Sequence, residues 1–128
     1  MSTDRTPIST SDAYAPSGSY SQAIVAGDVV YVSGQVALDA KTGETVGRDV
    51  ATQTNATIDN LEAVLAAAGC TLADVVKVTA HLAAFELFDD YDRVYRERFP
   101  EPRPARTTVA SGLGGVFVEL DCIAVRSS

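Results

Sequence analysis

The sequence predicts an α+β domain in which two helices cover one face of a mixed β-sheet. Three observations lead to this prediction. Apolar residues recur at helical spacing in segments 49–68 and 87–99, strand-like segments precede, separate and follow these helices, and turn residues lie between the segments. The resulting order, β-β-α-β-α-β-β, is typical of a single two-layer domain.

The chain of 128 residues is long enough for one domain with one hydrophobic core. Residues 1–18 are rich in Ser, Thr, Asp and Pro, and we expect a tail that is ordered only where it docks on the domain of residues 19–128. The N-terminus lacks the pattern of a secretory signal, and no apolar run reaches the length of a membrane span. A cytoplasmic protein without a membrane partner is therefore expected.

A β-hairpin and the clearest helix fill the first half of the domain. Residues 21–26 and 29–33 are predicted strands joined at Gly27-Asp28, a dipeptide that favours a tight turn. Residues 49–68 are a predicted helix, because Asp49 can cap its N-terminus and Gly69 suits its C-cap. Its apolar stripe recurs at Val50, Thr54, Ile58, Leu61, Leu65 and Ala68.

Three further strands and a second helix complete the domain. Residues 75–82 alternate between apolar and more polar side chains, which predicts a half-buried strand. Residues 87–99 carry an aromatic stripe at helical spacing, and Pro100 and Pro102 end this helix. Residues 105–110 and 116–125 are predicted strands separated by the glycine-rich turn 111–115.

The last strand predicts that one face of the sheet is left open. Alternate residues from 116 to 124 are all apolar and are expected to lie under the helices. The opposite face mixes Phe117, Ile123 and Val125 with the acids Glu119 and Asp121. An uncovered face of this character is typical of an interface or a pocket, so we expect it to meet another subunit.

Composition excludes several classes of function. A net charge of −7 without a basic patch argues against a nucleic-acid partner, which requires concentrated Lys and Arg. Cys70 and Cys122 are too few for a disulfide scaffold and are expected to be reduced, partly buried thiols. With His81 as the single histidine, no metal site is expected.

Arg106 and Glu119 are the strongest candidates for chemistry. They lie in strands that follow one another in the sequence, and we expect these strands to be adjacent in the sheet. Arginine gives two parallel hydrogen bonds to a carboxylate, and a carboxylate in a partly dry site suits general acid–base catalysis. Alternatively, Arg106 forms a structural ion pair with a neighbouring acid, and Glu119 is an exposed or interface residue. Thr108 shares the face of Arg106.

Tyr20, Ser33, Gly34 and Asp92 are further candidates for a pocket. Tyr20 and Ser33 offer hydroxyl groups, and Gly34 lets a backbone N–H approach a ligand closely. Turn or core roles remain the alternative for both hydroxyls, and Asp92 can equally be a solvated helix residue. His81 is expected to be a hydrogen-bonded sheet residue rather than a base.

Several short motifs, in this order and spacing, resemble the RidA/YjgF family of reactive-intermediate deaminases over nearly the whole chain, from about residue 14 to 126. The motifs are Gly18-Ser19-Tyr20-Ser21-Gln22, Tyr31-Val32-Ser33-Gly34-Gln35, Lys41-Thr42-Gly43-Glu44, Asp59-Asn60-Leu61, Ala67-Ala68-Gly69, Asp74-Val75-Val76-Lys77, Pro104-Ala105-Arg106 and the strand 118–125. The resemblance implies a chorismate-mutase-like α+β fold and a homotrimer with sites in the clefts between subunits.

The resemblance also implies a cofactor-independent hydrolase acting on C–N bonds. Its substrates are enamines and imines of 2-amino acids, such as 2-aminoacrylate (2-iminopropanoate) and 2-iminobutanoate, which become 2-keto acids and ammonia. The family's carboxylate-binding arginine corresponds to Arg106 and its water-activating glutamate to Glu119. Its pocket tyrosine and serine correspond to Tyr20 and Ser33, with backbone N–H groups near Gly34 and Thr108 assisting.

Two positions depart from the family pattern. Many members carry cysteine where this chain has Thr108 and asparagine where it has Asp92. These departures leave open a pathway-specific deaminase of the same fold that acts on one intermediate. A non-catalytic trimer that binds small carboxylates or unfolding proteins also remains an alternative. A ribonuclease, a label attached to some relatives, is disfavoured by the net charge.

Overall fold

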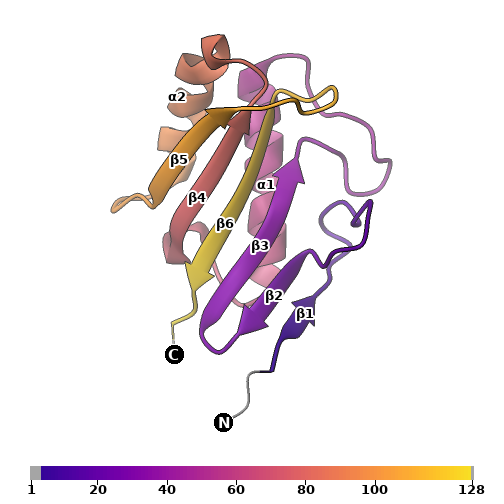
Figure 1. The fold of residues 1–128 in the computed structure, drawn as a ribbon, viewed down its shortest axis with the longest axis vertical. Coiled ribbons are helices and arrows are strands. Elements are labelled where there is room, and N and C mark those ends of the chain that lie inside the picture. The colour runs from indigo at the N-terminus through magenta and orange to yellow at the C-terminus, as the bar shows by residue number, and fades with distance from the viewer. Residues whose placement is uncertain (1–3, 128) are drawn as a thin grey trace.

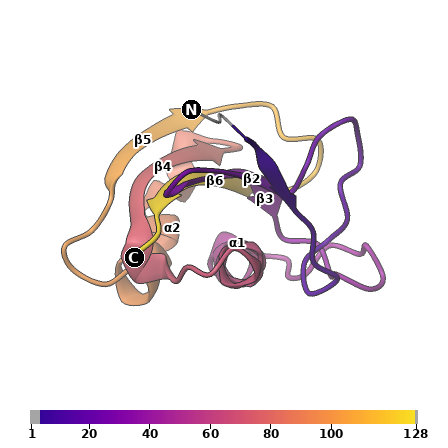
Figure 2. The ribbon, with the colours of Figure 1, turned by 90° about the horizontal axis from the view of Figure 1, so that it is seen from below.

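A six-stranded mixed sheet and two helices make up the fold in the computed structural model, which describes residues 4–127 (Figure 1). The strands are β1 (Thr6–Ile8), β2 (Ala23–Ala26), β3 (Val29–Val36), β4 (Val75–Leu82), β5 (Ala105–Ala110) and β6 (Val118–Val125). The helices are α1 (Val50–Ala67) and α2 (Phe88–Arg98), and single 3₁₀ turns precede β4 (Leu72–Asp74) and α2 (Phe85–Leu87). Both helices lie on one side of the curved sheet, which confirms the predicted α+β class (Figure 2).

The N-terminal segment contributes a strand that the sequence pattern did not predict. Within the expected tail, β1 pairs antiparallel with β2 and forms one edge of the sheet. The buried side chain of Gln22 holds the segment that follows. Its Nε2 donates to the carbonyl oxygens of Thr10 and Tyr14, both at 3.1 Å, and its Oε1 accepts from the Thr10 N–H at 2.7 Å. These hydrogen bonds, together with burial of Ala13 in the core, hold the segment against the domain.

The predicted helices are confirmed with small changes at their ends. Asp49 caps α1 by accepting a hydrogen bond from the Thr52 N–H at 2.8 Å. The C-cap residue is Ala68, and Gly69 follows with a φ of 81°, a backbone conformation that favours glycine. The second helix begins one residue later than expected, because residues 85–87 form the 3₁₀ turn. Among the described residues, no helix is long and apolar enough to cross a membrane.

The order of strands in the sheet is β1-β2-β3-β6-β4-β5, so β4 lies between β5 and β6. The expectation that the strands of Arg106 and Glu119 are adjacent was therefore wrong. The chain crosses from β4 through α2 to β5, which pairs parallel with β4, whereas β6 pairs antiparallel with both β3 and β4. A short turn between two strands in the sequence does not make them neighbours when an earlier strand already occupies the position between them.

The two faces of β6 are as predicted. Val118, Leu120, Cys122 and Ala124 are buried beneath the helices in the hydrophobic core. On the opposite face no helix covers the sheet (Figure 2), and this open face includes the half-buried Glu119, Asp121 and Ile123 and the exposed Val125. Cys70 and Cys122 are free and buried, as expected.

Candidate functional site

Arg106 lies on the helix side of the sheet. In the ladder it is paired with Val78 of β4, which is paired with Cys122 of β6. Laterally paired residues share a face, and Val78 and Cys122 are both buried under the helices. Thr108, two residues further along β5, lies on the same side.

The guanidinium of Arg106 is held by α2. Its Nη1 donates to Asp92 Oδ1 at 2.7 Å, and its Cζ lies 5.5, 5.4 and 4.6 Å from the ring centroids of Phe88, Tyr91 and Tyr95. Burial disfavours the charged form of Arg106, but the hydrogen bond to Asp92 and the nearby tyrosines outweigh this and raise its pKa. These interactions hold a permanently charged guanidinium group at the edge strand β5. They include an ion pair with a neighbouring acid, which was the alternative role predicted for Arg106.

Three buried hydroxyl groups lie close to this arginine. They belong to Tyr91, Tyr95 and Thr108. None of these hydroxyl oxygens forms a hydrogen bond with any residue in the range 4–127. Burial raises the pKa of both tyrosines, so they remain neutral hydroxyls at physiological pH. The predicted hydroxyl of Thr108 is thus beside Arg106, but buried.

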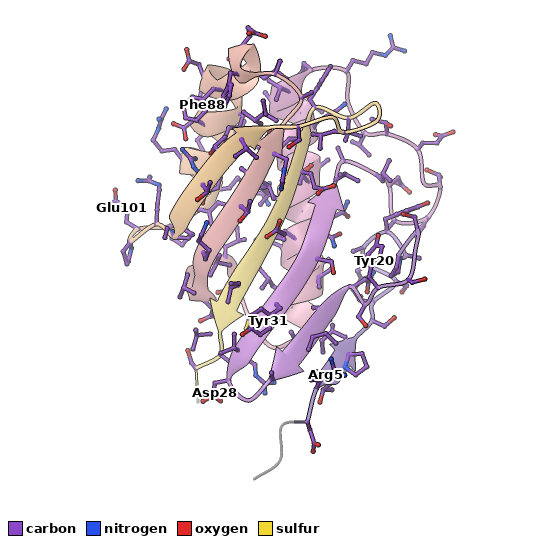
Figure 3. The ribbon with its side chains drawn as sticks, in the orientation of Figure 1. Arg5, Tyr20, Asp28, Tyr31, Phe88 and Glu101 are labelled. Atoms are coloured by element: carbon purple, nitrogen blue, oxygen red, sulfur yellow. The ribbon has the colours of Figure 1, made fainter. Side chains whose placement is uncertain are left out.

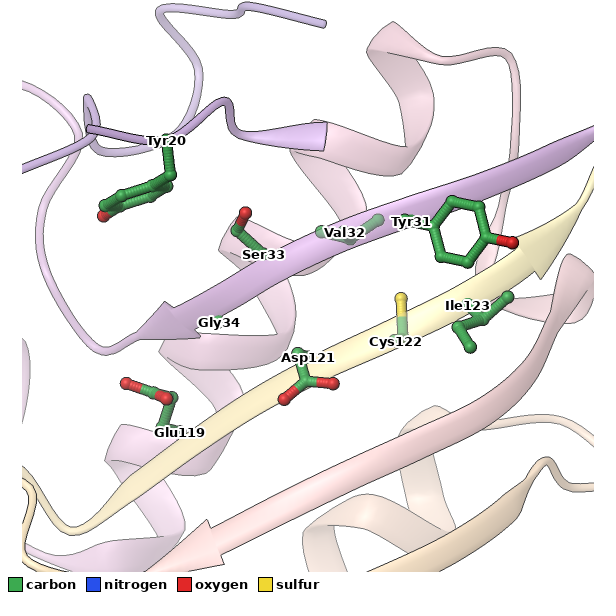
Figure 4. Close-up of a pocket in the computed structure, with 9 residues that line it drawn as sticks. All are labelled: Tyr20, Tyr31, Val32, Ser33, Gly34, Glu119, Asp121, Cys122 and Ile123. Carbon is green, nitrogen blue, oxygen red and sulfur yellow. The ribbon is translucent and has the colours of Figure 1, made fainter. Parts of the chain in front are cut away.

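Glu119 lies on the opposite side of the sheet. It is paired with His81 of β4, which is paired with Val109 of β5, so these three residues share the open face. Its side chain lines a pocket of about 540 Å³ on that face (Figure 4). The residues lining this pocket, which we call the open-face pocket, are Tyr20, Tyr31, Val32, Ser33, Gly34, Glu119, Asp121, Cys122 and Ile123.

Gly34 brings the backbone of β3 against the Glu119 carboxylate. An ideal Cβ at this glycine would lie 2.8 Å from Glu119 Oε2, too close for a real contact. Ser33, beside it, donates its hydroxyl to the Ser21 carbonyl at 2.7 Å and so ties β3 to the N-terminal loop. Tyr20 is about half exposed at the pocket wall, and its hydroxyl accepts a hydrogen bond from the Ser17 N–H at 3.2 Å.

Asp121 is the second acid of the open-face pocket. Burial raises the pKa of Asp121, against the opposing effect of His81 and Lys77. On the helix side of β6, burial raises the pKa of the Cys122 thiol to about 12, so this sulfur remains protonated and is a poor nucleophile. His81 is hydrogen-bonded as expected, with Nδ1 2.8 Å from the Ser111 hydroxyl and Nε2 4.0 Å from Asp121 Oδ2.

The predicted site residues therefore form two groups in a single chain. Tyr20, Ser33, Gly34 and Glu119 meet at the open face, whereas Arg106, Asp92 and Thr108 meet under α2. Figure 3 shows the separation, with Tyr20 near β2 and Phe88 on α2 beyond the opposite edge of the sheet. Arg106 and Thr108 therefore do not meet Glu119 within one chain, because they lie on the opposite face of the sheet.

Some lining residues were missed by the sequence reasoning. Tyr31 and Asp121 line the open-face pocket, and Arg96, Arg103 and Tyr95 line a second pocket beside Arg106. The parity of Asp121 with Glu119 was visible in the sequence and signalled a shared face. The proximity of Arg96 and Arg103 depends on how α2 packs, and no local pattern predicts it. Within residues 4–127, no group of three or more His, Cys, Asp or Glu residues could hold a metal ion.

Comparison with known sequences gives a consistent family assignment. The family model described as Endoribonuclease L-PSP matches residues 10–126. A RutC family protein of Pyrococcus horikoshii is 43% identical over 121 residues, covering 93% of this chain and 96% of the relative. A 2-iminobutanoate/2-iminopropanoate deaminase of Rattus norvegicus is 39% identical over 124 residues, with 95% and 90% of the two chains covered.

Solved structures have the same fold. A putative endoribonuclease from Thermotoga maritima superposes with a TM-score of 0.91 at 38% identity, covering 96% of this chain and 98% of that one. TdcF of E. coli with bound serine superposes with a TM-score of 0.89 at 32% identity, covering 95% and 99%. The fold of this chain is thus shared over almost its full length, including both groups of candidate residues.

Proposed function

Because the chain belongs to the RidA/YjgF family, whose model is described as Endoribonuclease L-PSP, we propose that it is an imine deaminase. Its substrates are the imines and enamines of 2-amino acids, including 2-aminoacrylate (2-iminopropanoate) and 2-iminobutanoate, and its products are 2-keto acids and ammonia. The names of the rat and human relatives as 2-iminobutanoate/2-iminopropanoate deaminases support this substrate class.

One observation carries the proposal. The Glu119 carboxylate lines the open-face pocket and forms no hydrogen bond or ion pair with the residues that the structure describes. A carboxylate that lines a pocket and has no partner among the described residues is available to a ligand or a water molecule, which supports a functional role. The backbone of Gly34 packs against the Glu119 side chain, and the carboxylate oxygens point toward the pocket.

The complete site is proposed to form between two copies of the chain in a homotrimer. Arg106 and Glu119 of one chain lie on opposite faces of its sheet and cannot hold the same small molecule. A neighbouring copy that covers the open face can bring its Arg106 to the Glu119 of the first. Exposed apolar residues at the sheet, Tyr31, Val109 and Val125, support burial of this face by another subunit.

In the proposed reaction, Arg106 binds the substrate carboxylate and so orients carbon C2. Only its Nη1 is hydrogen-bonded to a side chain among the described residues, so Nη2 and Nε remain free to donate. Glu119 accepts a proton from water as the water oxygen adds to C2. It passes that proton to the imine nitrogen, which gives a carbinolamine. A second proton then moves from the new hydroxyl to nitrogen through Glu119 as the C–N bond breaks, leaving a 2-keto acid and ammonia. Tyr20 and the backbone N–H groups near Ser33-Gly34 and Thr108 position the substrate.

A coupled assay tests this proposal. An amino-acid oxidase generates 2-iminobutanoate in the presence of semicarbazide, and an active deaminase lowers semicarbazone formation by removing the imine. We expect the wild-type protein to do so in proportion to its concentration. Binding of butanoate without any turnover of imines would instead identify a carboxylate-binding protein.

A further inference from the structure

The second pocket, beside Arg106, has an unusual concentration of positive charge. It measures about 330 Å³ and is lined by Asp92, Tyr95, Arg96, Arg103, Pro104 and Arg106. Three arginines and one carboxylate therefore line this pocket, in a chain whose net charge is −7. This local excess of positive charge contrasts with the net negative charge of the whole chain.

The three guanidinium groups are linked through Asp92 and the end of α2. Arg106 Nη1 donates to Asp92 Oδ1 at 2.7 Å, and Arg96 Nη1 donates to Asp92 Oδ2 at 3.4 Å. Arg103 Nη2 donates to the main-chain oxygen of Arg96 at 3.2 Å. Each guanidinium carries five N–H donors, so one aspartate and one carbonyl leave most of this capacity open to a ligand.

Arg96 and Arg103 are only loosely engaged with other groups. The Arg96 side chain is 58% exposed, and its contact with Asp92 is long. Arg103 also contacts Glu101 at 3.1 Å, but the side chain of that glutamate is 79% exposed. Exposed ion pairs contribute little and exchange readily, so a bound anion can replace them.

The side chain of Tyr95 adds an aromatic wall to the same pocket. The hydroxyl of Tyr95 is buried, forms no hydrogen bond with the described residues, and belongs to a side chain that lines this pocket. A buried hydroxyl without a partner is uncommon in folded proteins. That oxygen has almost no accessible surface, so the Tyr95 ring, and not its hydroxyl, is the part that a ligand in this pocket can contact.

We propose that this pocket binds a second carboxylate, so that the preferred substrates are imines of acidic amino acids such as aspartate. Arg106 binds the carboxylate next to C2, as in the proposed function on which this inference rests, and Arg96 and Arg103 bind the distal carboxylate. Once the ligand replaces the exposed Glu101 at Arg103, its two carboxylates balance the positive charge that Asp92 leaves uncompensated. A substrate with an apolar side chain leaves that charge partly unbalanced.

Two substrates of equal length test this preference. In 2-iminosuccinate a carboxylate replaces the terminal methyl group of 2-iminobutanoate, and both can be generated by amino-acid oxidases in the semicarbazide assay. We expect a higher kcat/KM for 2-iminosuccinate in the wild-type protein. The ratio of the two kcat/KM values should fall about tenfold in Arg103→Gln and in Arg96→Gln, since each loses a charged hydrogen bond to the distal carboxylate.

Arg93→Gln is the matched control, because Arg93 lies on α2 and pairs with the exposed Asp90 at 2.9 Å. We expect it to leave the ratio unchanged, and circular dichroism checks the fold of all three variants. A wild-type ratio of one or less, or a ratio that Arg103→Gln and Arg96→Gln do not alter, would overturn the inference while the deaminase proposal stands.

Calorimetric binding of succinate and butanoate separates the two proposals. These unreactive acids differ by the same exchange of a methyl group for a carboxylate. Tighter binding of succinate that weakens in Arg103→Gln supports the pocket even if no imine is turned over, in which case only the deaminase proposal fails. Equal binding of the two acids contradicts the pocket.

Discussion

The Arg106 side chain combines a structural and a proposed chemical role. Its ion pair with Asp92 and its contacts with three aromatic rings order the guanidinium before any ligand arrives. Such preorganisation reduces the entropy lost on binding. The same ion pair means that a substrate carboxylate must share Arg106 with Asp92.

Replacement of Arg106 by alanine should remove deaminase activity. Loss of a bidentate, charged hydrogen-bonding interaction with the substrate carboxylate should lower kcat/KM by at least about a hundredfold, as measured in the semicarbazide assay. Arg93→Ala on the same side of the molecule is the control and should retain full activity. Full activity of Arg106→Ala on 2-iminobutanoate would contradict the role given to Arg106.

Glu119 should be required for turnover but not for binding. Glu119→Gln keeps the shape of the side chain and removes its basicity, so kcat should fall about a hundredfold or more, while affinity for butanoate in calorimetry stays near that of the wild type. An equal loss of binding and of turnover would mean that Glu119 only holds the ligand.

Gly34→Ala provides a second test of the open-face pocket. The added Cβ would collide with the Glu119 carboxylate, which is the flexible end of a side chain and can move aside. We therefore expect a clear fall in kcat with little change in the midpoint of thermal unfolding. Gly112→Ala is the control, because a Cβ there meets no atom within 4 Å, and it should change neither quantity.

At the scale of elements, local pattern predicted most of the fold. The alternation of residues 75–82 predicted β4 to the residue, because one face of this strand lies in the core, and the predicted strand 105–110 matches β5. By contrast, β1 has only three residues, and long-range contacts of Gln22 hold the segment after it. Parity grouped Arg106 with Thr108 but could not determine which face they occupy, since that depends on pairing with β4.

Gln22→Ala should destabilise the attachment of the N-terminal segment. It removes three hydrogen bonds and leaves the buried polar groups of residues 10 and 14 without partners, so we expect a loss of about 1–3 kcal/mol in the free energy of unfolding by urea. Thr10→Ala keeps these backbone bonds and serves as the control. An unchanged unfolding curve for Gln22→Ala would show that the segment is held by other contacts.

At the scale of the whole molecule, Arg106 and Glu119 of one chain lie on opposite faces of its sheet. This placement predicts that two inactive variants, one altered at each residue, can complement each other. Arg106→Ala and Glu119→Gln trimers should each be inactive, but subunits unfolded and refolded together at equal amounts should form mixed trimers. If each site takes Arg106 from one copy and Glu119 from its neighbour, about a quarter of the sites are intact, and about that fraction of wild-type activity should return. Simple mixing without exchange of subunits is the control. Absence of recovered activity in verified mixed trimers would place both groups in one chain.

If the site forms between copies of the chain, as proposed, activity should depend on protein concentration. A lone chain carries every proposed group and yet no complete site, so the specific activity should fall once dilution shifts the equilibrium from assembled to free subunits, by mass action. Association would then act as the switch that turns the enzyme on, and the amount of protein in the cell would govern how much of it can work.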